Sequence, residues 1–252
     1  MKKFLEQFNF KPELAGHIGI ERERFLHSSE GKPIPRAKEF LAKINDPLWT
    51  YELSACQVED RTPPLYDLPN ILQSLGTNDG QGIAVAQSLG LKLVATPVAP
   101  LDMNLEVYPD ERYHRIAKSI SAETLRAACR VAGIHIHFGM RGLDQAIRAH
   151  NVFRKYLPTL VRLGDNSNGE RTRLYEAMAP NWNPPEIKDA KHFFSLAREQ
   201  DFTENPRNCY WLIRISSHGT VELRMFGSTR SRSRIVLYAT FGRYLLKKSG
   251  IV

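Results

Sequence analysis

The sequence lacks the features that mark several protein classes. Within its 252 residues, no apolar run approaches the roughly 20 residues needed to cross a bilayer. The start, MKKFLEQFNF, carries two lysines but is interrupted by polar residues before a signal-peptide core can form. The three cysteines, Cys56, Cys129 and Cys209, form no C-x-x-C pair, which favours free buried thiols over a disulfide framework or a zinc knuckle. We therefore expect a cytoplasmic protein.

Two common phosphate-binding motifs are also absent. The sequence contains neither G-x-x-x-x-G-K-[ST] nor G-x-G-x-x-G, which excludes a P-loop and a kinase-type fold. Thirty-five Lys and Arg against 27 Asp and Glu give a net charge of +8, which suits a nucleic-acid binder or an enzyme of anionic substrates. Only Arg230, Arg232 and Arg234 form a basic run, whereas other arginines accompany the motifs below. We do not expect nucleic acid to be the main partner.

Composition and patterning predict an ordinary globular protein. With 42% hydrophobic and 25% charged residues and no repeat or long linker, residues 1–252 are expected to form a single domain. Strands are predicted at 16–26, 49–62, 91–98, 132–140, 209–216 and 220–226, the last two as a hairpin. Helices are predicted at 36–44, 67–75, 83–89, 110–119, 122–130, 143–163 with a kink at Pro158, 186–198 and 235–248. This order favours an α+β fold, an antiparallel or mixed sheet with helices on one face.

Several strands place titratable residues above an apolar underside. In Thr220–Phe226, Glu222 and Arg224 lie on one side, opposite a row of aliphatic residues. Glu21 and Glu23 share a strand face in the same way, as do His135 and His137. Glu59 shares a face with Gln57, and Glu52 reaches that face only through a bulge or bend. Each pair alone is typical of a solvated sheet face, but four such segments in one chain favour a shared site.

The residue types indicate a particular chemistry. Gathered carboxylates repel one another unless cations lie between them. Oxygen-rich clusters with one imidazole suit Mg²⁺, or Mn²⁺, better than zinc. Arginine beside such a cluster can clamp phosphoryl oxygens. Together these groups are those required for phosphoryl transfer from a nucleotide.

These segments carry a resemblance to a known family. GIERERFL (19–26), QVEDRTPP (57–64), AGIHIHFG (132–139), W-x-I-R (211–214) and GTVELRMF (219–226) resemble, in the same order, motifs of the glutamate–cysteine ligase type 2 family of carboxylate–amine ligases. The resemblance spans roughly residues 16–230. It implies a glutamine-synthetase-like catalytic fold, with a curved, mainly antiparallel sheet that binds Mg²⁺ and ATP. It also implies formation of a γ-glutamyl-type amide from an amino acid and an amine, through an acyl phosphate.

The resemblance assigns expected roles to individual residues. It implies that the metal ligands are Glu21, Glu23, Glu59, His137 and Glu222, with Glu52 as a further acid. Glu222 and Arg224 are the expected catalytic pair, with Arg224 holding the transferring phosphoryl group. Arg214 is expected to bind the nucleotide or the acyl phosphate, and Arg171 and Arg173 match substrate-binding or ATP-binding positions of the family. An open sheet edge would also allow a homo-oligomer.

Other functions remain open on the residues alone. The loop GDNSNGERTR (164–173) is shorter than in the family, and the tail from Met225 resembles shorter amidoligases that act on peptide or cell-wall amines. The H-x-H strand also occurs in metal-dependent hydrolases, although in the barrel enzymes it comes early in the chain. A non-catalytic basic binding module is the remaining alternative.

Overall fold

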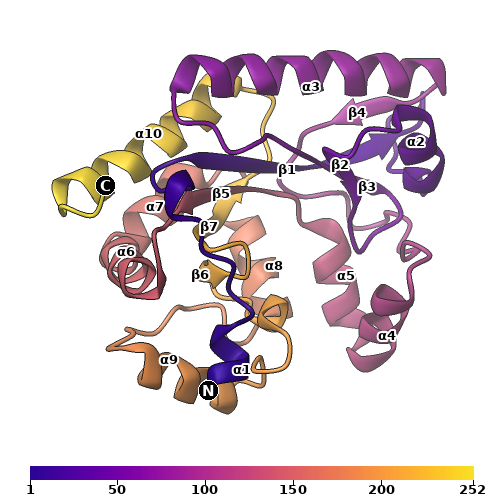
Figure 1. The fold of residues 1–252 in the computed structure, drawn as a ribbon. Coiled ribbons are helices and arrows are strands. Elements are labelled where there is room, and N and C mark those ends of the chain that lie inside the picture. The colour runs from indigo at the N-terminus through magenta and orange to yellow at the C-terminus, as the bar shows by residue number, and fades with distance from the viewer.

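The computed structural model describes residues 1–252, which build one seven-stranded antiparallel sheet (Figure 1). The strand order is β2-β3-β1-β5-β7-β6, and β4 pairs with the C-terminal end of β1. The strands are β1 (Ile18–His27), β2 (Trp49–Tyr51), β3 (Gln57–Arg61), β4 (Lys92–Val94), β5 (Gly133–Gly139), β6 (Ile213–Ser216) and β7 (Thr220–Gly227). The predicted α+β fold with an antiparallel sheet is confirmed, but helices lie on both sides of the sheet and not on one face only.

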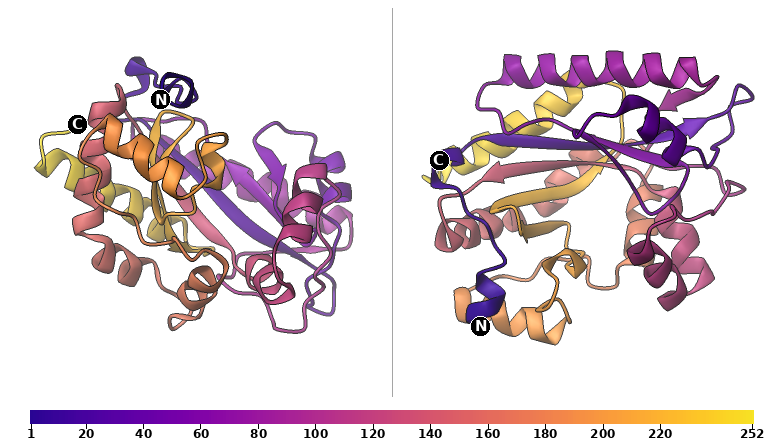
Figure 2. Two further views of the ribbon diagram at one scale, coloured as in Figure 1. Left: turned by 90° about the horizontal axis from the view of Figure 1, so that it is seen from below. Right: turned by 45° about the vertical axis from the view of Figure 1, so that its right-hand side comes forward.

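Ten α-helices surround this sheet. The α-helices are α1 (Lys2–Leu5), α2 (Ala37–Ile44), α3 (Leu68–Ser88), α4 (Glu111–Ser119), α5 (Ala122–Arg130), α6 (Leu143–Lys155), α7 (Leu157–Gly164), α8 (Glu170–Met178), α9 (Ala190–Glu199) and α10 (Arg232–Lys248). Helices α6, α7 and α10 pack against β5, β6 and β7, and α10 also packs against α3. The views in Figures 1 and 2 show α3 on one side of the sheet and α4 and α5 on the other. None of the helices combines the length and apolarity that crossing a bilayer requires.

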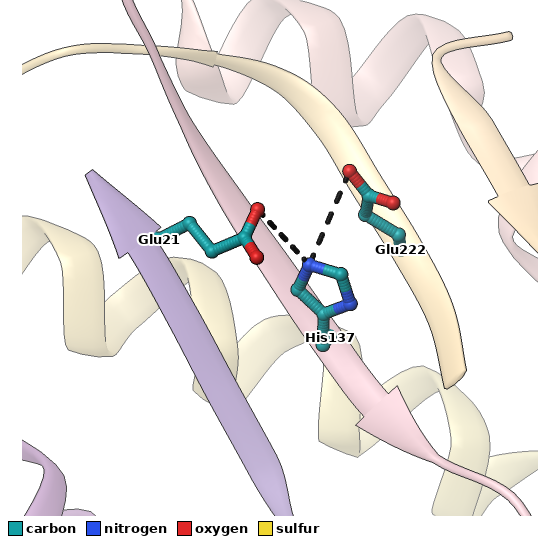
Figure 3. Close-up of side chains that lie close together, drawn as sticks. All are labelled: Glu21, His137 and Glu222. Atoms are coloured by element: carbon teal, nitrogen blue, oxygen red, sulfur yellow. Dashed lines mark ion pairs between the residues drawn. The ribbon is translucent and has the colours of Figure 1, made fainter. Parts of the chain in front are cut away.

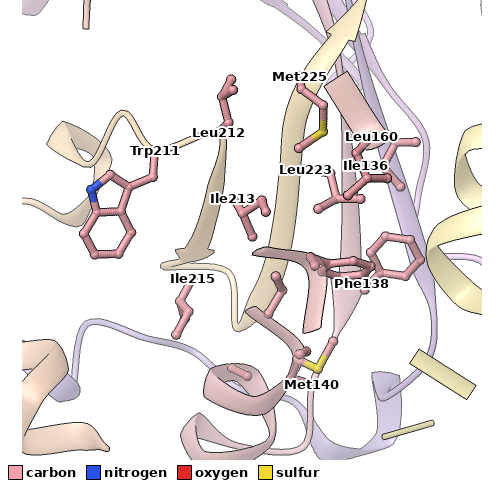
Figure 4. Packing of buried hydrophobic residues seen from close by; sticks show 14 of the residues in the cluster. Ile136, Phe138, Met140, Leu160, Trp211, Leu212, Ile213, Ile215, Leu223 and Met225 are labelled. Atoms are coloured by element: carbon pink, nitrogen blue, oxygen red, sulfur yellow. The ribbon is translucent and has the colours of Figure 1, made fainter. Parts of the chain in front are cut away.

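The apolar face of the sheet forms the main core. Because side chains alternate along each strand, Ile136 and Phe138 of β5 and Leu223 of β7 point to the same side. Figure 4 shows them packed with Leu160 of α7. These side chains are at most 1% exposed and belong to a cluster of 38 buried residues. Burial of this face fixes which side of each strand is turned toward the other, polar face.

One predicted helix break is wrong. The segment TNDGQG does not interrupt the helix, and α3 runs for 21 residues from Leu68 to Ser88. Within it, Asn78 donates hydrogen bonds to Asp60 Oδ2 (2.8 Å) and to the carbonyl of Arg61 (3.0 Å). A Cβ on Gly82 would lie 2.4 Å from the Trp49 ring, so glycine here permits close helix packing. Tertiary contacts therefore outweigh the low helix propensity of this segment.

Other boundaries also differ from the predictions. The segment predicted as one strand over 49–62 is a hairpin of β2 and β3, and Glu52 lies in its connection. The predicted helix over 143–163 is divided at Tyr156 into α6 and α7, just before Pro158. Helix α8 was not predicted, because it begins directly after Gly169, which has a φ of 77° in the turn-rich loop. Helix α9 begins at Ala190, not at residue 186.

Candidate active site

The polar face of the sheet brings acids and imidazoles from four strands together. In the antiparallel ladders, Glu23 of β1 is opposite Glu59 of β3, and Glu21 is opposite His135 of β5. The next ladder places His137 opposite Glu222 of β7. Directly opposed residues in antiparallel strands have Cβ atoms about 5 Å apart, so their side chains meet above the sheet.

Three overlapping groups of these side chains have the spacing of metal ligands. The groups are Glu21, His137 and Glu222; Glu21, Glu59 and His135; and Glu23, Glu52 and Glu59. In each group one potential ligand atom per residue lies within 4.8 Å of the others. Glu21 and Glu59 each belong to two groups, so the groups form one continuous row.

His137 is held in a defined orientation between two carboxylates. Its Nδ1 atom lies 2.8 Å from the Thr220 hydroxyl oxygen. Its Nε2 atom is buried without a hydrogen-bond partner and lies 3.3 Å from Glu21 Oε2 and 4.0 Å from Glu222 Oε1 (Figure 3). Burial lowers the pKa of His137, but the charges of Glu21 and Glu222 outweigh burial and raise this pKa above its ordinary value. The free Nε2 atom is thus directed into the carboxylate cluster.

The carboxylates at the end of this row that lies nearest β2 and β3 repel one another. Burial raises the pKa of Glu52 to about 8, and the charge of Glu23 adds to the effect. Burial and the charge of Glu21 also raise the pKa of Glu59 well above its ordinary value. Glu21 differs: burial raises its pKa, but the neighbouring imidazoles of His137 and His135 outweigh burial and lower the pKa well below the ordinary value. A cation between Glu23, Glu52 and Glu59 would relieve this repulsion.

Glu222 organises two arginines. Arg214 Nε lies 2.5 Å from Glu222 Oε2, and Arg224 Nη1 lies 2.5 Å from Oε1. Burial raises the pKa of Glu222, but Arg214 and Arg224 lower it far more, so the carboxyl is ionised. The other hydrogen bonds of the two guanidiniums to protein atoms come from Nη1 of Arg214 and from Nε of Arg224, which lies 3.2 Å from the Tyr175 hydroxyl. Nη2 of both arginines is left for a ligand.

The carboxylates of Glu21, Glu23, Glu52 and Glu59, together with His135, Arg214 and Arg224, line a cavity of about 530 Å³, whereas His137 and Glu222 are not among its lining residues. Its floor is the polar face of the sheet, and α4, α5 and α8 contribute to its walls. Basic residues surround the acids, namely Arg61, Arg112, Arg171, Arg207, Arg214 and Arg224. This size lies within the range of small-molecule binding sites. An anion with several charges would fit here once the acids hold cations.

Most residues expected at the site from sequence meet in this cluster of side chains. The metal-type groups contain Glu21, Glu23, Glu52, Glu59, His137 and Glu222, and Arg214 and Arg224 lie beside them. Glu52 reaches the cluster from the β2–β3 connection, not from a bulged strand.

The two remaining arginines are placed differently. Arg171 lines the cavity but is buried, and its guanidinium donates to the carbonyls of Ala132 (3.0 Å), Met225 (3.2 Å) and Arg224 (3.1 Å). Arg173 is exposed and does not line the cavity. The geometry therefore supports these two residues least as ligands of a substrate.

Two residues of the site were not assigned a role from sequence. His135 lies 3.2 Å from Glu21 Oε2 through Nδ1 and 3.5 Å from Glu23 Oε1 through Nε2. Its position on the same strand face as His137 was the available signal. Tyr175 contacts Arg224 from α8, and no sequence pattern links these two residues.

Solved structures identify the class of fold. A bifunctional glutathione synthetase from Pasteurella multocida matches with a TM-score of 0.58 and 14% identity, covering 96% of this chain and 39% of that chain. A structure described as "Apo GmaS without ligand" matches with a TM-score of 0.50 and 13% identity, covering 96% of this chain and 57% of the other. The chain thus shares the fold of these two proteins, over only part of their length.

The family follows from the sequence match. The chain belongs to Glutamate-cysteine ligase family 2, whose model matches residues 17–249. It is 25% identical over 251 residues to a glutamate–cysteine ligase of Natronomonas pharaonis, covering 92% of this chain and 69% of the relative. A glutamate–cysteine ligase of Haloquadratum walsbyi is 24% identical over 230 residues, covering 83% of this chain and 63% of the relative. The resemblance noted from the motifs is confirmed, and the chain is an enzyme of the carbon–nitrogen ligase type.

Proposed function

We propose that residues 1–252 form one ligase domain that joins a carboxylate to an amine at the expense of ATP, through an acyl phosphate and with Mg²⁺. The observation that carries this proposal is the row of three ligand groups beside two arginines with free Nη2 atoms. The γ-carboxylate of glutamate is the expected acid, by analogy with the relatives' names. The identity of the amine stays open, with small amino acids and peptide-type amines as candidates.

The residues present fit divalent cations. Each of the three groups contains at least two carboxylates, and two of them add an imidazole, a donor set that suits Mg²⁺ or Mn²⁺. The raised pKa values of Glu52 and Glu59 and the buried, unpartnered Nε2 of His137 are what a cation would correct. When bound, the cations would supply charge neutralisation of the phosphate oxygens.

The protein's own groups would do the remaining work. Arg214 and Arg224, fixed by Glu222, would direct Nη2 at phosphoryl oxygens that gain charge during transfer. Tyr175 would hold Arg224 in orientation through its hydroxyl. Helices α4, α5 and α8 would enclose the reacting groups and limit access of water.

The decisive experiment is a paired screen of acids and amines with ATP and Mg²⁺, in which phosphate release and product mass are measured together. We expect phosphate release only when glutamate and a suitable amine are both present. Glu21→Gln, Glu59→Gln and Glu222→Gln should each reduce ligation at least about tenfold. Glu30→Gln, at an exposed turn residue, is the matched control and should leave ligation unchanged.

Two results would contradict the proposal. Full ligation activity in all three site variants would show that the acids are not the metal site. Absence of thermal stabilisation by ATP with Mg²⁺, combined with salt-sensitive binding of nucleic acid, would favour the basic binding module. A cytoplasmic location and a homo-oligomeric state remain predictions, to be tested by fractionation and by light scattering.

A further inference from the structure

A second cavity lies on the reverse side of β1. It has a volume of about 480 Å³ and is bordered by β1, β4, α3 and the segment that leads into α10. Because side chains alternate along β1, Arg22 and Arg24 point into this cavity while Glu21 and Glu23 line the candidate active site. The two cavities therefore share a strand but no lining residue. We refer to the second one as the reverse-face cavity.

The reverse-face cavity has an excess of positive charge. Five cationic side chains line it: Arg22, Arg24, Lys92, Arg230 and Arg232. Two carboxylates offset part of this charge. Asp60 lies 2.7 Å from Arg22 Nη2 and 2.5 Å from Arg24 Nη2, and Asp79 lies 2.9 Å from both arginines.

Three of the five cations lie outside this buried network. Arg230 and Lys92 form no ion pair, and Arg232 approaches Asp79 only to 3.7 Å. Five cations against two carboxylates leave a surplus of three positive charges around one cavity. Such a surplus favours an anionic ligand.

One lining residue of this cavity, Arg24, carries an unpartnered donor. Arg24 is only 5% exposed, and its buried Nε atom has no hydrogen-bond partner. The guanidinium carbon lies 4.9 Å from the centre of the Trp49 ring, which fixes the arginine in place. A buried N–H group without an acceptor costs about 1–3 kcal/mol, so this position is suited to an acceptor that is supplied by a ligand.

Apart from Gln87 and Thr229, the uncharged part of the lining is apolar. Ile83 and Ala86 of α3 and Leu91, Leu93 and Val94 around β4 complete the walls. Thr229 and Arg230 also line the cavity, just before Ser231 caps the N-terminus of the 17-residue helix α10. The partial positive charge of that helix end adds to the charge of the arginines.

We propose that the reverse-face cavity binds a small phosphate-bearing molecule whose phosphate contacts Arg24, Arg230 and Arg232 and whose apolar part lies along Ile83, Leu91 and Leu93. The planar donors of several arginines match phosphate oxygens, and the apolar wall accommodates a hydrocarbon or ring. This site differs from the candidate active site in its acids, because only one carboxylate, Asp79, lines it, whereas five acids line the other cavity. Binding here is independent of the proposed ligase reaction.

The test uses the full chain freed of divalent cations by a chelating resin, with phenyl phosphate and inorganic phosphate as probes. We expect calorimetry to show that phenyl phosphate binds about tenfold tighter than inorganic phosphate, since only the former buries apolar surface. Binding should also change tryptophan fluorescence through Trp49, and Trp49→Phe should abolish that change while it preserves the calorimetric signal.

Charge variants locate the site. Arg230→Glu/Arg232→Glu should weaken phenyl phosphate binding about 100-fold. Lys247→Glu/Lys248→Glu makes the same charge change at the exposed far end of α10 and should leave the affinity unchanged. Ile83→Glu adds a negative charge to the apolar wall and should weaken binding about tenfold. Because Ile83 is 41% exposed, this variant provides a second test if the double variant folds poorly.

Several results would overturn the proposal. These are no binding by the wild-type chain, equal losses in the two double variants, or a fluorescence change that persists in Trp49→Phe. Loss of binding in Arg214→Gln, on the other face, together with full binding in Arg230→Glu/Arg232→Glu, would assign the phosphate to the candidate active site. None of these readouts depends on ligase activity, so the two proposals fail separately.

Discussion

The Nε2 atom of His137 lies 3.3 Å from a carboxylate oxygen of Glu21 and is buried without a hydrogen-bond partner. The contact joins two strands whose residues are more than a hundred positions apart in the sequence. Thr220 holds the opposite ring nitrogen, so the orientation of the imidazole is fixed before any ligand arrives. A histidine arranged in this way is typical of a metal ligand with a supporting second contact.

The first prediction concerns His137. His137→Asn should raise the Mg²⁺ concentration needed for half-maximal ligation at least about tenfold, because one ligand of the proposed site is removed. Activity should recover in part at saturating Mg²⁺. Kinetics measured across a Mg²⁺ titration provide the test, with the exposed His114→Asn as the control. An unchanged Mg²⁺ requirement would exclude His137 as a ligand.

The second prediction concerns repulsion among the carboxylates. The pKa of Glu52 is raised to about 8, first by burial and then by the charge of Glu23. Glu52→Gln should therefore raise the melting temperature of the metal-free protein by about 2–4 °C, because an amide carries no charge in this cluster. The same variant should gain less stability from added Mg²⁺ than the wild type does.

Calorimetric melting with and without Mg²⁺ measures both effects. The exposed Glu30→Gln is the control and should follow the wild type in both conditions. If the metal-free Glu52→Gln protein melts below the wild type, the carboxylates are not under mutual strain.

The third prediction separates two roles for Arg171. Since its guanidinium donates to three buried backbone carbonyls, Arg171→Lys should lower the free energy of unfolding by roughly 3 kcal/mol. Arg173→Lys, at an exposed position two residues away, should have almost no effect. Urea unfolding tests this directly. An Arg171→Lys protein of full stability that binds ATP poorly would restore the role in ligand binding expected from the sequence.

The fourth prediction is a pH dependence caused by His150 of α6. Burial lowers its pKa from the ordinary 6.5 to about 4, while its ring packs against Trp211. The unfolded chain takes up a proton here as the pH falls below 6.5, and the folded chain does so only near pH 4. The stability present above pH 6.5 should therefore fall as the pH is lowered to 4, by roughly 3 kcal/mol in total.

A variant identifies His150 as the source. His150→Gln cannot titrate in this range, so its unfolding free energy should depend less steeply on pH between 6.5 and 4. The exposed His114→Gln should retain the slope of the wild type. Equal slopes in all three proteins would show that another group is responsible.

The sequence predicts the faces of the strands better than it predicts their connections. Alternation in β7 assigned Glu222 and Arg224 to one side and Leu223 to the other, and the structure has this arrangement. That success has a local cause, because the side-chain period of a strand is two and a buried face fixes it. The convergence of Glu23, Glu59 and His135 depends on ladder register, which ordered motifs could only imply.

The errors arise where distant residues decide local structure. The break predicted in α3 ignores the hydrogen bond from Asn78 to Asp60 and the contact of Gly82 with Trp49. For Arg171, whose role in ligand binding stays a prediction, no local pattern indicates that carbonyls of β7 accept hydrogen bonds from its guanidinium. Neither feature has a signature within its own segment.

The alternation of Glu21, Arg22, Glu23 and Arg24 along β1 has a consequence for how the chain finds its native pairing. If β1 slipped by one position against β3 and β5, guanidiniums would enter the acid cluster and carboxylates would be buried under α3. Such a misaligned sheet would place unpaired ions on both sides at once. The alternating charges therefore disfavour a shifted alignment of this central strand. A one-residue insertion or deletion within β1 should abolish folding together with catalysis.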